Sequence, residues 1–104
     1  MNKKLKTVRK DIDRVDVKIM HLLYARKRFA KELILCKNTE KKMLRDTARE
    51  KEILRSRENG ARKLGLNQRS IVAIWKILIH DLLREQKRIV NERKVTSKKK
   101  CPNR

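Results

Sequence analysis

The stretch LLYARKRFAKEL, residues 22–33, decides the fold, because it continues an apolar helical stripe and interrupts that stripe with a charge. Counting outward from it, apolar residues recur at alternating steps of three and four, which is typical of one face of a long helix. The stripe comprises Leu5, Val8, Ile12, Val15, Ile19, Leu22, Phe29, Leu33 and Cys36. Arg26 stands inside it, and the pattern predicts one continuous helix from about Leu5 to about Lys37.

Such a helix is long for a chain of 104 residues. At 1.5 Å per residue it extends roughly 50 Å, which is too long for a compact monomer of this size. Its apolar stripe would stay half exposed unless another chain covered it. We therefore expect an intertwined helical homodimer held together by this helix.

Two further helices are predicted downstream, one starting near Asp46 and one capped by Asn67. Gly65 can take the left-handed conformation that ends the first of these two. Their apolar faces comprise Ile53, Leu54, Ala61 and Leu64, and then Ile71, Ile74, Trp75, Leu78, Ile79, Leu82, Leu83 and Ile89. No alternating run bounded by turn residues favours a strand, so the class is all-α with three helices per chain, one of them very long.

Periodicity is lost from Asn91 onward, in NERKVTSKKKCPNR. We therefore expect a single helical domain at residues 1–92 and a disordered basic tail at residues 93–104.

The formal charge of +20 suggests an anionic partner, either nucleic acid, an acidic surface or a small anion. It does not choose among them, because the basic residues are scattered over the solvent-facing positions.

The two cysteines have neither a metal-ligand spacing nor a disulfide framework, which is typical of a reduced cytoplasmic chain. The basic start MNKKLKTVRK is followed by no uninterrupted apolar segment, so neither a signal peptide nor a membrane span is expected.

Three polar side chains intrude on the apolar faces: Arg26, Glu50 and Gln86. Each has an ordinary explanation. Arg26 could form a structural salt bridge to Glu50, and Gln86 could drift into solvent at a helix end. Four more charged residues lie around them: Arg9, Lys37, Asp46 and Arg49. Of these, Arg9 and Lys37 could be plain surface charges. Together these residues would place several positive charges and few negative ones between the predicted helices, and a doubly negative ligand would balance them.

Three segments carry a family resemblance: VRKDIDRVDVKIMHLLYARKRFAKELILCK at residues 8–37, RDTAREKEIL at 45–54 and IVAIWKILIHDLLREQ at 71–86. In this order they resemble the three helices of the all-helical chorismate mutases, including the N-terminal mutase domain of the bifunctional chorismate mutase and prephenate dehydratase proteins. The resemblance implies the rearrangement of chorismate to prephenate in phenylalanine and tyrosine biosynthesis, with no metal or organic cofactor.

The resemblance also implies roles for the polar residues. Arg26, together with Arg9 of the partner subunit and with Arg49, would bind the two substrate carboxylates. Lys37 and Gln86 would donate to the ether oxygen whose bond breaks, with Lys37 also touching a carboxylate. The ring hydroxyl would be held by Glu50 and by the backbone at Asp46. Arg26 would then await an anion that the substrate brings.

Leu82 departs from the family pattern, because related mutases often place a small polar residue there; we expect one hydrogen bond fewer and lower substrate affinity.

Three alternatives stay open. Isochorismate pyruvate lyase has the same fold and also binds a dicarboxylate, although Glu50 favours the mutase. A basic helical nucleic-acid-binding protein would not explain Glu50 and Gln86 on inward faces, so nucleic acid is not the expected partner. A non-catalytic dimerisation module would tolerate the loss of Arg26.

Overall fold

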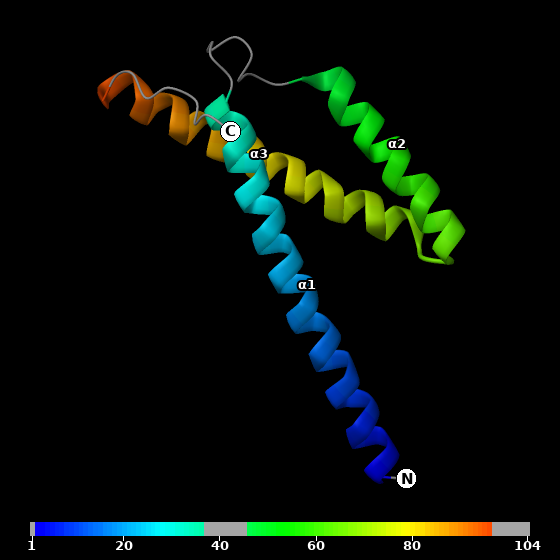
Figure 1. The fold of residues 1–104 in the computed structure, drawn as a ribbon. Helices are drawn as coiled ribbons and strands as arrows, with labels where there is room; N and C mark the ends of the chain where they lie inside the picture. Colours follow the sequence, from blue (N-terminus) through cyan, green and yellow to red (C-terminus); the bar gives the residue numbers. More distant parts are fainter. Residues whose placement is uncertain (1, 37–45, 97–104) are drawn as a thin grey trace. The chain divides into compact units, whose positions relative to one another are not determined.

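The computed structural model describes residues 2–36 and 46–96, and its regular structure is entirely helical (Figure 1). Helix α1 spans Asn2–Cys36, α2 spans Thr47–Leu64 and α3 spans Gln68–Thr96. No strand occurs among these described residues. The predicted all-α class, with three helices of which one is very long, is confirmed.

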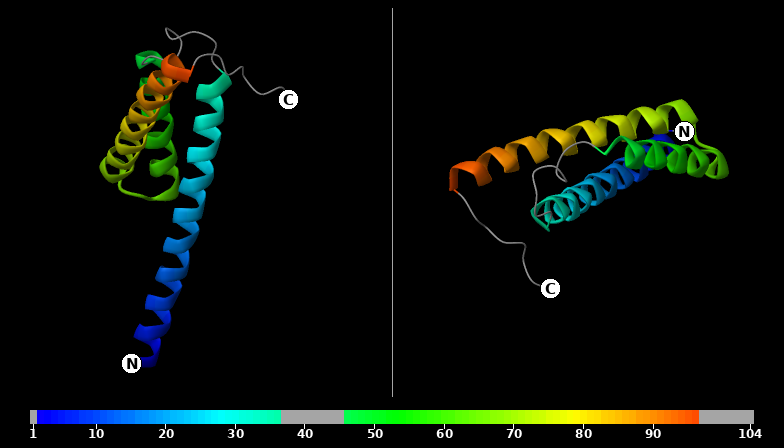
Figure 2. Two further views of the ribbon diagram at one scale, coloured as in Figure 1. Left: turned by 90° about the vertical axis from the view of Figure 1, so that its left-hand side faces the viewer. Right: turned by 90° about the horizontal axis from the view of Figure 1, so that it is seen from above.

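The chain divides into two units, Met1–Glu32 and Leu33–Arg104. The first contains most of α1. The second contains the last turn of α1 together with α2 and α3, and these two helices pack side by side as an antiparallel hairpin (Figures 1 and 2). The single domain predicted at residues 1–92 stays a prediction.

Helix α1 begins slightly before the predicted start at Leu5 and spans Asn2–Cys36, and the predicted end at Lys37 lies outside the described residues. In its first turns the hydroxyl of Thr7 donates to the carbonyl oxygen of Lys3 at 2.9 Å. The predicted stripe is exposed in the single chain: Val8 is 45% and Leu22 is 68% accessible to solvent. At the last turn the buried residue is Ile34, whereas Leu33, which was predicted to lie on the stripe, is exposed.

The ends of the hairpin helices follow the predicted signals. The Asp46 side chain accepts a hydrogen bond from the Arg49 backbone N–H at 3.0 Å and so caps α2. Gly65 has φ 73°, and the N–H of Leu66 donates to the carbonyl of Ala61 at 2.8 Å, which closes the other end. The side-chain oxygen of Asn67 accepts from the Ser70 N–H at 2.9 Å and caps α3. The predicted helix start near Asp46, the left-handed end at Gly65 and the cap at Asn67 are confirmed.

Helix α3 continues to Thr96, so the prediction of a disordered tail at residues 93–104 is wrong for residues 93–96. The physical reason is local. Arg88 pairs with Glu85 at 2.7 Å and with Glu92 at 2.5 Å, at helical spacings of three and four residues. Such pairs and residues of high helix propensity support a helix without an apolar stripe. The rest of the predicted tail, residues 97–104, lies outside the described part of the chain.

The core of the second unit is small. Its buried apolar side chains, among the described residues, are Ile34, Ala61, Ile79 and Ile89. Trp75 lies on α3 with the guanidinium carbon of Arg57 from α2 at 5.6 Å from its ring centre. The indole N–H of Trp75 is buried and has no acceptor within the described chain. This core is thus mainly aliphatic, in a chain with only 3% aromatic residues.

Candidate active site

Gln86 is the only buried polar residue among those whose burial the structure describes, with 8% of its surface accessible. It lies on α3 one turn after Leu82 and one turn before Ile89. Its side-chain amide forms no hydrogen bond to another described residue. The alternative in which Gln86 drifts into solvent at a helix end is therefore wrong, because α3 continues past it and apolar neighbours flank it.

The start of α2 gathers three of the predicted site residues: Asp46, Arg49 and Glu50. The backbone N–H of Glu50 donates to the carbonyl oxygen of Asp46 at 3.0 Å, so this carbonyl already accepts one hydrogen bond. Arg49 is exposed and its guanidinium pairs with Glu52. Glu50 is partly buried and already has a partner within the chain. This turn therefore contains a carboxylate and a carbonyl four residues apart in sequence.

Arg9 and Arg26 lie on α1 within the first unit. Arg9 is exposed, and Arg26 is partly exposed and already has an interaction partner. A substrate carboxylate would therefore add to or replace that contact at Arg26, rather than meet an unpartnered charge. Lys37 lies outside the described residues. The convergence of all the predicted residues on one pocket stays a prediction.

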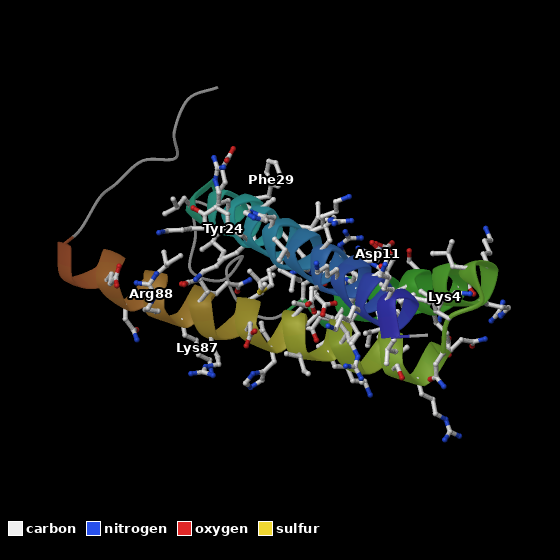
Figure 3. The ribbon with its side chains drawn as sticks, turned by 90° about the horizontal axis from the view of Figure 1, so that it is seen from below. Lys4, Asp11, Tyr24, Phe29, Lys87 and Arg88 are labelled. Atoms are coloured by element: carbon white, nitrogen blue, oxygen red, sulfur yellow. The ribbon has the colours of Figure 1, made fainter. Side chains whose placement is uncertain are left out.

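One charged cluster beside Gln86 was not among the predicted site residues. Arg88 lies on α3 next to Lys87 (Figure 3). Arg88 donates to both carboxylate oxygens of Glu85, and also to Glu92. The hydrogen bond to Glu85 is the main cause that raises the pKa of Arg88, and the charges of Glu85 and Glu92 add to it. The spacing of these residues, three and four apart, is a sequence signal that could have found the cluster.

Ile34 was also missed. The sequence places three apolar residues, Leu33, Ile34 and Leu35, in a row at the end of α1, and periodicity favoured the first of them. Ile34 is the residue that contacts the core, where it packs with Ile89, while Leu35 and Leu82 cover the pair. This contact lies on the same face of α3 as Gln86.

The family model for chorismate mutase type II matches residues 8–87. The chain belongs to this family. The matched range contains every predicted site residue, from Arg9 to Gln86. Membership supports chorismate mutase activity in general, which means an isomerase-type enzyme with chorismate as its substrate. No curated protein and no solved structure is significantly similar to this chorismate mutase family member.

No helix in the described part of this family member has an apolar segment long enough to cross a membrane.

Proposed function

We propose that the protein catalyses the Claisen rearrangement of chorismate to prephenate for phenylalanine and tyrosine biosynthesis in the cytoplasm. In this unimolecular reaction the ether C–O bond breaks while a C–C bond forms, and no proton, electron or external group is transferred. The enzyme therefore has to fold the substrate and stabilise developing charge, and it needs no nucleophile or general base. We also propose that the chain is similar to the N-terminal mutase domain of the bifunctional chorismate mutase and prephenate dehydratase proteins.

The residue roles follow from the family resemblance. Arg26 and Arg49, with Arg9 of the partner subunit, bind the two carboxylates, because a guanidinium offers paired donors that match a carboxylate. Holding both carboxylates at a fixed separation selects the folded conformer of chorismate in which the reacting atoms are close. Glu50 and the Asp46 backbone bind the ring hydroxyl.

The carboxylate-binding residues thus prepare the substrate, and the remaining residues, Lys37 and Gln86, act on the bond that breaks. Both donate to the ether oxygen, which gains negative charge as the C–O bond stretches. Donors that are fixed in advance stabilise this charge more in the transition state than in the ground state.

The structural observation that supports the proposal is the burial of Gln86. Gln86 is a buried residue, with 8% of its surface accessible, and no described residue supplies a hydrogen-bond partner for its amide. Among the described residues the Trp75 indole N–H is the fully buried polar side-chain atom without a partner, so the Gln86 amide keeps an open path to a ligand. An ether oxygen brought by a ligand would satisfy the amide, which supports its role as the donor.

A homodimer is the assembly that we propose. The α1 stripe from Leu5 to Leu22 is exposed in the single chain. Exposure of these apolar side chains to water is unfavourable, so covering them would stabilise the protein. A second copy of α1 would cover it and bring Arg9 to the partner's site. We propose that residues 1–92 form the catalytic domain and that the basic residues after it lie outside the site.

The test is to incubate the purified full-length chain with chorismate and, separately, with isochorismate. We expect prephenate from chorismate and no pyruvate from isochorismate. A mock preparation from host cells without the gene, purified in the same way, controls for traces of host mutase. Pyruvate release from isochorismate without prephenate formation would assign the lyase. Turnover of neither substrate, together with DNA binding that weakens steeply with salt, would favour the nucleic-acid alternative.

A further inference from the structure

The last turn of α1 is attached to α3 by an apolar cluster whose α3 members lie one turn before and one turn after Gln86. Ile34 is 1% exposed and Ile89 is 4% exposed, and Leu35 and Leu82 pack against this pair. All four belong to the unit that begins at Leu33. The contact therefore lies within one unit of the chain, and it joins residues that are far apart in sequence.

The α3 members of the cluster share a face with Gln86. Leu82, Gln86 and Ile89 are spaced by four and then three residues, so their side chains follow one another along one side of the helix. The stretch from Leu82 to Ile89 covers about 10 Å at the rise of an α-helix. Gln86 thus lies between the two residues that hold the end of α1.

Packing is what restrains the Gln86 side chain. Glutamine has several rotatable bonds and loses up to about 2 kcal/mol of rotamer entropy when it is fixed. No hydrogen bond to a described residue fixes this amide, and the residue is only 8% exposed, so neighbouring side chains on the same face of α3 restrict its orientation.

We propose that Ile34 and Ile89 are positioning residues, which hold the amide of Gln86 in the orientation that the ether oxygen requires. This inference rests on the proposed function. A donor that acts on charge developing in the transition state affects kcat when it is misplaced, and leaves substrate binding by the carboxylate-binding residues unchanged. Loosening the cluster therefore lowers kcat and leaves KM close to that of the unsubstituted enzyme.

The experiment compares two variants that each lose one methyl group from a buried isoleucine of α3. Ile89→Val loosens the cluster, whereas Ile79→Val, at a site with 8% exposure about two turns before Gln86, serves as the control. Both variants should lower Tm by a similar few degrees. We expect kcat to fall about threefold or more in Ile89→Val and to stay unchanged in Ile79→Val, because small misplacements of a catalytic group are costly. Ile34→Ala should lower kcat more, roughly tenfold.

A double substitution separates positioning from general stability. If Ile89 acts through the Gln86 amide, Ile89→Val has no further effect on kcat once Gln86→Ala is present. Equal loss of kcat in Ile79→Val and Ile89→Val, or a full effect of Ile89→Val in the Gln86→Ala background, would overturn the inference. If Gln86→Ala keeps full activity in a preparation shown to be free of host mutase, the donor role under the proposed function has failed instead.

Discussion

Gln86 illustrates what one side chain contributes that its neighbours cannot. Its amide can donate a hydrogen bond at any pH, because it does not titrate, whereas a carboxyl group donates only when it is protonated. The residue is 8% exposed and shares a face of α3 with Leu82 and Ile89, which limits the water around it. A donor in such surroundings interacts more strongly with developing charge than an exposed one would.

The substitution Gln86→Glu tests this chemistry. The glutamate carboxyl donates to the ether oxygen only below its pKa, and the apolar surroundings raise that pKa above the ordinary value of about 4.3. We expect kcat of the variant to rise as pH falls through this pKa, while the unsubstituted enzyme changes little over the same range. The measurement is kcat against pH for both proteins. A variant profile that stays flat down to acidic pH, in a protein that is still folded, would argue against donation by residue 86.

Arg26 shows how far residue-level prediction from the sequence extends. Its place inside the stripe of α1 is visible in the spacing of the apolar residues. The sequence could not say whether its charge was already compensated, because a salt-bridge or hydrogen-bond partner of a long side chain depends on which groups fold next to it. In the structure it has a partner within the chain.

The helix ends of the hairpin were predictable at the scale of the element. Caps are local, since Asp46, Gly65 and Asn67 each act on backbone groups within four residues. The energy of such a cap depends on a few neighbouring torsions, so the residue type alone carries the signal.

The two glycines of the chain, Gly60 and Gly65, allow a matched test of this point. Gly60 lies inside α2 and Gly65 ends it with φ 73°, and an added Cβ meets nothing within 4 Å at either position. Gly60→Ala should stabilise the fold by about 0.5–1 kcal/mol, because alanine loses less backbone entropy in a helix. Gly65→Ala should destabilise it by roughly 1–2 kcal/mol, because the left-handed conformation strains a residue with a Cβ.

Urea denaturation of both variants measures the two free energies of unfolding against the unsubstituted chain. The opposite signs are the result that matters. If both substitutions change stability in the same direction, the left-handed conformation of Gly65 is not what ends α2.

At the scale of the whole molecule, the exposed face of α1 is the dominant feature. Helix α1 is 35 residues long, and its stripe at Leu5, Val8, Ile12, Val15, Ile19 and Leu22 is exposed in the single chain. An apolar surface of this extent normally marks an interface. The proposed two-fold dimer would cover it with an identical stripe, and each site would then require an arginine from each subunit.

Subunit exchange tests the shared site. We expect Arg9→Ala and Arg26→Ala each to be nearly inactive, since each lacks one carboxylate-binding residue in every site. Unfolded together and refolded, the mixture should regain about a quarter of the unsubstituted activity, because half of the random dimers each contain one complete site. The activity of the mixture is compared with that of each variant refolded alone. No recovery after exchange has been verified by mass would show that Arg9 does not act across the interface.

The sequence by itself determined the three helices, their caps, and the placement of Gln86 on an apolar face, because helical periodicity and capping depend on residues within a turn or two. Only the tertiary structure decided that Ile34 rather than Leu33 meets the core, and that it packs with Ile89 beside Gln86. The last turn of α1 has three apolar residues in a row, and the residue that is buried depends on where α3 lies against it. That direction is set by packing between residues more than fifty positions apart, which no local pattern records.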